Sequence, residues 1–156
     1  GGTVIRELFK DPNNLWISKF HTILSKAVKN YIKDLKIDSN HPFLIQKINQ
    51  ISIDNCWVNF LESGDFQSNH IHNNGWLSGV YYLDEPKVET SKSNAGWIEF
   101  NRSGYNLPHF GGEKGIKSIK PEVGMFLLFP SYVWHGTIPY TTAYTRGSIS
   151  FDITIE

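Results

Sequence analysis

Apolar residues between positions 14 and 36 recur at alternating spacings of three and four. The series is Trp16, Phe20, Ile23, Leu24, Ala27, Val28, Tyr31, Ile32 and Leu35. Such spacing lines one side of an α-helix. Pro12 and the pair Asn13 and Asn14 precede it as start and capping candidates, and turn-forming residues follow it. We predict a helix over residues 14–36 whose apolar stripe packs on a flat surface.

From residue 50 onward the pattern changes to short segments rich in β-branched and aromatic residues, separated by Gly, Pro, Asn and Ser. They read "QISIDNCWVNFLE", "LSGVYYL", "GWIEF", "IKSIKP", "GMFLLFP" and "RGSISFDITIE". These features are typical of β-strands. No helical pattern alternates with them, which argues against a parallel βαβ sheet and favours an antiparallel sandwich, barrel or jelly roll. A length of 156 residues suits a single domain.

Side chains on a strand alternate between its two faces, so the last segment has two different sides. One side carries Arg146, Ser148, Ser150 and Asp152, and the other carries Ile149, Phe151 and Ile153. We expect the apolar side to meet the helix. A buried arginine needs a partner, so the polar side, together with hydroxyls of "SGVYYL", predicts an anion-binding pocket.

Composition excludes several classes of partner. Fifteen basic and fifteen acidic side chains cancel, so a nucleic-acid or membrane-surface partner is not expected. The single Cys56 cannot form an intramolecular disulfide, and no apolar run approaches the roughly 20 residues of a membrane span. No signal peptide pattern opens the chain. We expect a cytoplasmic protein acting on a small molecule or a peptide, with its oligomeric state left open.

Three histidines are candidate metal ligands. His70 and His72, in "SNHIHNNG", project to the same side of an extended segment and can reach one ion at about 2.0–2.2 Å. Alone, such a pair is more often part of an ordinary turn. His135, in "GMFLLFPSYVWHGTIP", offers a distant third ligand of the kind that strands of a closed antiparallel barrel bring together.

The order His-x-His, "SGVYYL", "GWIEF", "GMFLLFPSYVWH" and "RGSISF" resembles the iron(II)- and 2-oxoglutarate-dependent dioxygenases. The resemblance is to their prolyl-hydroxylase-like branch and its microbial and phage relatives, and it covers about residues 51–154. It implies a mainly β fold, the double-stranded β-helix or jelly roll, whose major sheet is buttressed by N-terminal helices.

The resemblance also implies that His70, His72 and His135 bind Fe(II). The family pattern normally has two histidines and one carboxylate, and His72 stands at the position of the carboxylate. A set of three neutral ligands changes the charge of the site by one unit. In the implied reaction, 2-oxoglutarate is oxidatively decarboxylated and the substrate is hydroxylated.

By the same resemblance, a pocket beside the metal binds 2-oxoglutarate. Arg146 pairs with the far carboxylate, because a planar guanidinium can donate two parallel hydrogen bonds to it. Tyr82 and Ser150 assist, and Ser78 lines the same pocket. Asn59, next to a phenylalanine where some relatives have a tyrosine, offers a further polar contact.

Substrate contacts are predicted from position alone. Trp57, Trp76, Trp97 and Trp134 could line a substrate cleft, although large aromatics in a small β domain more often belong to the core. Trp76, next to the histidines in a glycine-containing turn, is the best candidate for substrate contact. The long polar segment 101–115 carries Tyr105 and His109, which we expect to close over a substrate.

Two other interpretations stay open. The patterns Gly-x5-His-x-His and Gly-x5-Pro-x4-His are similar to the metal motifs of cupins, which share the architecture. A cupin-type metalloprotein would not use 2-oxoglutarate, but its first motif wants a glutamate that is missing here, and it does not account for Arg146. The third interpretation is a non-catalytic jelly-roll module for binding or structure.

Overall fold

The fold is known from a computed structural model, which describes residues 2–6, 8–11, 13–45, 48–84, 94–108, 112–139 and 143–155. Its elements are β1 (Thr3–Ile5), η1 (Leu8–Lys10), α1 (Leu15–Asp34), β2 (Ile51–Leu61), β3 (Leu77–Tyr82), β4 (Ile98–Phe100), η2 (Gly112–Gly115), β5 (Lys117–Ile119), β6 (Phe126–Pro130), β7 (His135–Thr137) and β8 (Arg146–Ile155). None of the helices in these ranges has the length and apolarity to cross a membrane.

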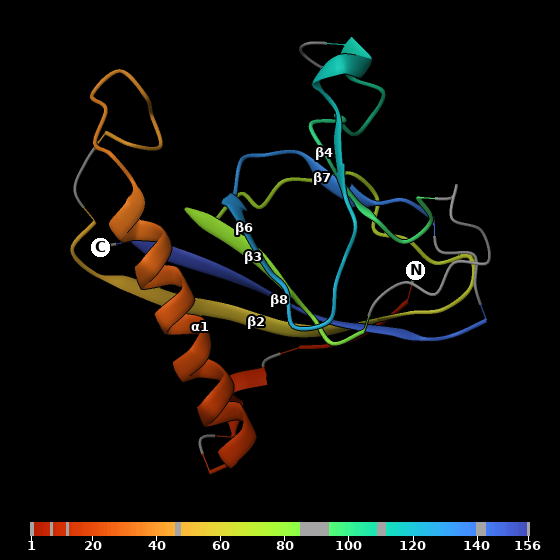
Figure 1. The fold of residues 1–156 in the computed structure, drawn as a ribbon, viewed down its shortest axis with the longest axis horizontal. Coiled ribbons are helices and arrows are strands. Elements are labelled where there is room, and N and C mark those ends of the chain that lie inside the picture. The colour runs from red at the N-terminus through yellow and green to blue at the C-terminus, as the bar shows by residue number, and fades with distance from the viewer. Residues whose placement is uncertain are drawn as a thin grey trace.

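Two antiparallel sheets form the body of the protein. The larger has the strand order β1-β2-β8-β3-β6, and the smaller has the order β5-β4-β7. Helix α1 lies across one side of the larger sheet, and the smaller sheet lies on its other side (Figure 1). The predicted mainly β architecture with one buttressing helix is confirmed. The pattern of residues did not predict β1 and β7, which have three residues each.

Helix α1 begins where the sequence suggests. The side chain of Asn14 accepts hydrogen bonds from the backbone N–H groups of Trp16 and Ile17, at 3.0 and 3.3 Å. This satisfies two of the donors that the first turn of a helix leaves open. At the other end Leu35 is extended, and its N–H bonds to the carbonyl of Ile32.

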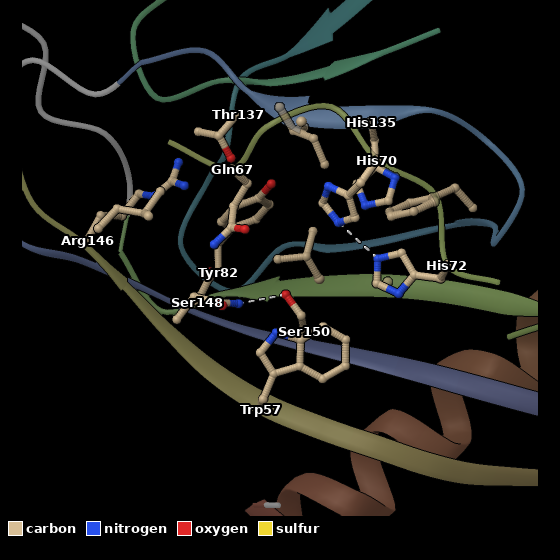
Figure 2. A pocket seen from close by; sticks show the side chains of 17 residues that line it. Trp57, Gln67, His70, His72, Tyr82, His135, Thr137, Arg146, Ser148 and Ser150 are labelled. Atoms are coloured by element: carbon tan, nitrogen blue, oxygen red, sulfur yellow. Dashed lines mark hydrogen bonds between the residues drawn. The ribbon is translucent and has the colours of Figure 1, made fainter. Parts of the chain in front are cut away.

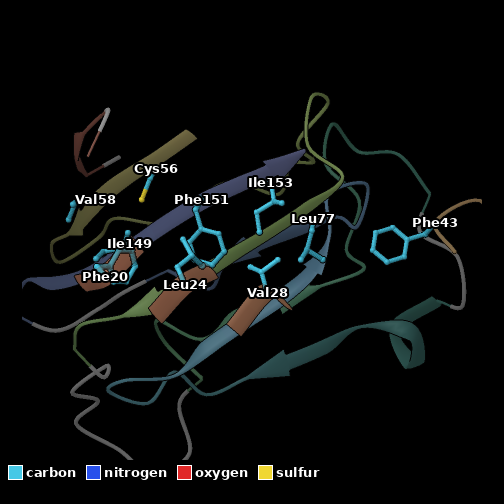
Figure 3. Packing of buried hydrophobic residues seen from close by; sticks show 10 residues of the cluster. All are labelled: Phe20, Leu24, Val28, Phe43, Cys56, Val58, Leu77, Ile149, Phe151 and Ile153. Atoms are coloured by element: carbon cyan, nitrogen blue, oxygen red, sulfur yellow. The ribbon is translucent and has the colours of Figure 1, made fainter. Parts of the chain in front are cut away.

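The main core lies between α1 and the larger sheet, and Figure 3 shows the two sets of side chains facing each other. The helix contributes Phe20, Leu24 and Val28, and β8 contributes Ile149, Phe151 and Ile153. The expectation that the apolar side of the last strand meets the helix is confirmed. Gly79 on β3 is required by this packing, because a Cβ there would lie 2.5 Å from the Phe151 ring.

The opposite side of the same strands faces the smaller sheet. Strand β8 pairs with β2 so that Ser148 lies across from Asn59 and Ser150 from Trp57. A register shift between Ile53 and Asn55 then brings Asn55 opposite Asp152. Such a bulge changes the alternation of side chains along β2, so that residues before and after it can face the same side of the sheet although their numbers differ in parity.

Replacing Leu24 tests the helix–sheet core. Leu24 has no exposed surface, so Leu24→Ala should lower the free energy of unfolding by about 2–5 kcal/mol in urea titrations. Ile23 is its matched control, because it is 56% exposed on the same helix, and Ile23→Ala should cost less than about 0.5 kcal/mol. Equal losses in the two variants would contradict this packing.

Candidate active site

Backbone pairing places two of the three histidines. His70 and His135 form an antiparallel bridge in which each N–H donates to the other's carbonyl, at 2.9 and 3.0 Å. Residues opposed in this way project their side chains to the same side. The N–H of His72 donates to the carbonyl of Ser131 at 2.9 Å, which ties the His-x-His segment to the turn that leads into β7.

The three imidazoles converge at one point. Their candidate ligand nitrogens all lie within 4.8 Å of one another. The Nε2 atoms of His70 and His72 are 3.2 Å apart, and the ring centres of His70 and His135 are 4.4 Å apart. The fold therefore brings together the three histidines that the sequence predicted as ligands, although His70 and His135 are 65 positions apart in the chain.

Hydrogen bonds on the far side of each ring set its tautomer. The Nδ1 atoms of His70, His72 and His135 contact the Ser68 carbonyl, the Asp152 carboxylate and the Val133 carbonyl, at 2.6, 2.6 and 3.0 Å. Because these oxygens only accept, we assign the proton of each ring to Nδ1, which leaves the Nε2 lone pairs directed at one another. Two such lone pairs repel unless a cation lies between them. Nitrogens bound at about 2.1 Å to one ion are typically about 3 Å apart.

Burial keeps two of these rings neutral. It is the main cause that lowers the pKa of His135 to about 3, and it also lowers the pKa of His70. Neutral imidazole is the form that binds a metal. Three imidazoles on one side of an ion fit a divalent transition metal such as Fe(II), and they leave its other positions open.

A cavity with an empty volume of about 580 Å³, part of it open to solvent, extends from the histidines. Figure 2 shows the histidines at one end and Arg146 at the other, with Gln67, Thr137 and Tyr82 between them. The cavity therefore joins a candidate metal centre to a buried cation.

Arg146 is held firmly at its end of the cavity. Only 3% of it is exposed, its Nη1 donates to the Gly96 carbonyl, and its guanidinium carbon lies 5.6 Å from the centre of the Tyr82 ring. Burial raises the pKa of Tyr82, so the phenol stays protonated and remains a donor. On the adjoining wall, the Asn59 amide donates to Ser150 Oγ at 2.8 Å.

Several residues singled out in the sequence lie elsewhere. Ser78 does not line the cavity, because its hydroxyl bonds to Asp152 and Ser131, both at 2.7 Å. Trp76 lies on the helix side, where it stacks on Phe43 with ring centres 4.5 Å apart.

The loop residues predicted to contact a substrate are only partly described. Tyr105 is 86% exposed, and it lines an outer groove that also includes His70. His109 lies outside the described residues.

Sequence reasoning missed several residues that line the cavity or support it. Gln67 and Thr137 face its interior. Trp57, which the sequence left open between a cleft and the core, lines the cavity and stacks along His72 with ring centres 5.8 Å apart. Asp152 contacts His72 directly. Its position on the polar side of the last strand was a signal for this contact, but the alternation of one strand does not reveal which histidine lies opposite.

Comparison with known proteins agrees with this geometry. A family model described as "Putative 2OG-Fe(II) oxygenase" matches residues 55–152, which is more than half of the chain. The chain belongs to this family. Members are named for 2-oxoglutarate and Fe(II), and the matched segment contains the three histidines and Arg146. No curated protein matches the sequence.

Solved structures share the fold of this oxygenase family member at low sequence identity. AviO1 from Streptomyces viridochromogenes has a TM-score of 0.64 and 13% identity, over 97% of this chain and 66% of that one. A prolyl hydroxylase from Trichoplax adhaerens, in complex with a hypoxia inducible factor peptide fragment, has 0.61 and 21%, over 99% and 63%. A Pseudomonas putida prolyl-4-hydroxylase has 0.60 and 16%, over 97% and 72%. The chain thus spans less than two thirds of the length of the first two. The predicted double-stranded β-helix is confirmed.

The neutral histidines predict how stability depends on pH in the metal-free protein. The pKa of His135 is near 6.5 in the unfolded chain and about 3 in the folded one, so below pH 6.5 the unfolded state binds the extra proton. Stability should therefore fall as the pH drops from about 6.5 toward 3, with a slope of up to about 1.4 kcal/mol per pH unit from this group. Urea titrations at several pH values measure the slope.

The matched control is His135→Gln, which keeps a polar side chain but cannot take up the proton. Its slope between pH 6.5 and 4 should be shallower than that of the unmodified protein. The same slope in both proteins would contradict the burial of a neutral His135.

Proposed function

We propose that the protein is an Fe(II)- and 2-oxoglutarate-dependent oxygenase that hydroxylates a small-molecule or peptide substrate. The observation that carries this proposal is the cavity itself. At one end the Nε2 lone pairs of His70, His72 and His135 converge, and at the other lies the buried guanidinium of Arg146.

The two ends match the two ends of 2-oxoglutarate. Its oxoacid end chelates a metal, and its far carboxylate requires a positive partner. Arg146 supplies that charge, and the hydroxyls of Tyr82 and Ser150 lie on the walls of the same cavity. The amide of Asn59 holds Ser150 Oγ in place. Desolvation strengthens such a contact, because a buried carboxylate has no water to replace the guanidinium.

When bound, the iron and the cosubstrate would supply the oxidising chemistry, in which 2-oxoglutarate, O₂ and a substrate C–H group yield succinate, CO₂ and the hydroxylated substrate. The protein's own part is to hold the three nitrogens, anchor the far carboxylate and limit access of water. Phe129 and Phe100 contribute to the last task, with ring centres 4.5 and 6.3 Å from that of His135.

The groove beside the histidines supports an uncharged polar substrate. Five of the twelve residues that line it carry amide side chains, and its two charged residues, Arg6 and Asp152, have opposite signs. The amides are Asn55, Asn59, Gln67, Asn73 and Asn74. Amides donate and accept hydrogen bonds without net charge, which suits peptide groups or hydroxylated small molecules. They do not provide the clustered cations that bind phosphate backbones.

Anaerobic binding of Fe(II) and 2-oxoglutarate tests the proposal. We expect the weak visible charge-transfer band of the chelated pair, and we expect it to require His135. The absence of a band in the unmodified protein would overturn the proposal. Metal binding without the band would favour a cupin-type site, and the absence of metal binding would favour a non-catalytic module.

Arg146 is tested by comparing cosubstrates. The unmodified protein should bind 2-oxoglutarate at least ~10-fold more tightly than 2-oxobutanoate, which lacks the far carboxylate, since one charge-assisted hydrogen bond contributes about 1.5–3 kcal/mol. Arg146→Ala should remove most of this preference, and Arg146→Lys should keep part of it because the charge remains. A preference that persists in Arg146→Ala would contradict the assigned role.

A further inference from the structure

We infer that Asp152 is a positioning residue of the metal centre, which acts through His72. It holds the His72 ring in its metal-binding orientation. It also supplies, on the far side of that ring, the negative charge that an aspartate ligand supplies directly in the usual family pattern. This inference rests on the metal centre of the proposed function.

The contact itself is short and sheltered. Asp152 Oδ1 lies 2.6 Å from His72 Nδ1, and each side chain is 13% exposed. A carboxylate accepting from an imidazole N–H at this distance forms a charge-assisted hydrogen bond. On the other side of the same ring, Nε2 points toward His70 Nε2 at 3.2 Å. Asp152 is therefore one imidazole away from the ion position and is not itself a ligand.

A closed circuit of hydrogen bonds fixes the position of the carboxylate. Ser78 Oγ donates to Asp152 Oδ1 at 2.7 Å and lies 2.7 Å from Ser131 Oγ. Because the single hydroxyl proton of Ser78 goes to the carboxylate, Ser131 donates to Ser78. The Ser131 carbonyl accepts the backbone N–H of His72 at 2.9 Å, which closes the circuit.

Sheet pairing builds this circuit into the fold. Ser78 on β3 and Asp152 on β8 are direct cross-strand partners. Gly75 leaves room for the turn, since a Cβ there would lie 2.5 Å from Ser131 Oγ. Trp57, from the neighbouring strand β2, stacks along the His72 ring. His72 is therefore held by three contacts: at its ring Nδ1, at its backbone N–H and along one face of its ring.

The chemical effect follows from the direction of the hydrogen bond. A carboxylate that accepts the Nδ1 proton increases the electron density at Nε2 and strengthens the bond from Nε2 to a cation. His70 and His135 have neutral carbonyls at the corresponding position, so among the three ligands only His72 has a charged partner there. His72 stands where the usual family pattern has a carboxylate ligand, and it is also the histidine that is hydrogen-bonded to a carboxylate, that of Asp152.

Titration of metal-free protein with Co(II) under anaerobic conditions tests the inference, using the visible spectrum of the bound ion as the signal. Asp152→Asn keeps the shape and an acceptor oxygen but removes the charge, and we expect it to weaken Co(II) binding about 10–100-fold. Asp65→Asn is the matched control, because Asp65 is also a partly buried carboxylate that accepts a hydrogen bond, from the N–H of Glu62 at 2.9 Å. Its affinity should stay within about twofold of the unmodified protein.

Making the same Asp152→Asn substitution in a His72→Asp variant separates a positioning role from a general structural role. In His72→Asp, no imidazole N–H remains for Asp152 to hold, so adding Asp152→Asn should cost less than about threefold in Co(II) affinity. A structural role would cost the same in both backgrounds. Thermal unfolding of the metal-free variants identifies any that are not folded, and the comparison between the two backgrounds is unaffected by a uniform loss of stability.

The outcomes distinguish this inference from the proposed function. If Asp152→Asn binds Co(II) as the unmodified protein does, or if its cost is equal in the two backgrounds, the inference is overturned and the oxygenase proposal stands. If Co(II) binding depends on Asp152 but 2-oxoglutarate does not bind, the oxygenase proposal fails and the inference stands. If the unmodified protein binds no Co(II), both are overturned.

Discussion

The alternation of side chains along β8 is the constraint on which the other features depend. This strand lies between β2 and β3 in the larger sheet, so both of its edges are paired, and its two faces meet different surroundings. Ile149, Phe151 and Ile153 face the helix, while Arg146 and Asp152 face the other way. Because the period of a strand is two, a slip of one residue would exchange these faces. The packing of α1 thus sets the register that orients both the cavity arginine and the carboxylate behind His72.

Two of the three histidines are positioned by segments with little regular secondary structure. His70 belongs to no strand, and β7 has three residues, yet their mutual hydrogen bonds align two metal-ligand candidates as closely as a long ladder would. The smaller sheet is in turn joined through β4, whose Phe100 pairs with His135. The site is therefore built at the seam between the two sheets.

The helix, six of the strands and the three histidines follow from the sequence because each has a signal that is local or is carried by a known motif. Other features depend on which elements meet. A three-residue strand containing glycine, such as β7, has too little pattern to be recognised. Trp76 has the parity of Ser78, but it lies just before β3, where alternation no longer holds, and stacking on Phe43 places it on the helix side. Ser78 was assigned to the correct strand, but its partner Asp152 is 74 positions away.

The acceptors behind the three imidazoles differ in how far along the chain they lie. For His70 and His135 the acceptor is a carbonyl two residues earlier, so the short local segment already selects the tautomer. For His72 the acceptor comes from β8, which is the last strand of the described chain. The local chain thus fixes the tautomer of two of the ligands, whereas the tautomer of His72 depends on the position of β8 between β2 and β3. The metal centre is thus completed by the pairing of β8 with its two neighbours, so a change that displaces the end of β8 would affect His72 and leave the acceptors of His70 and His135 in place.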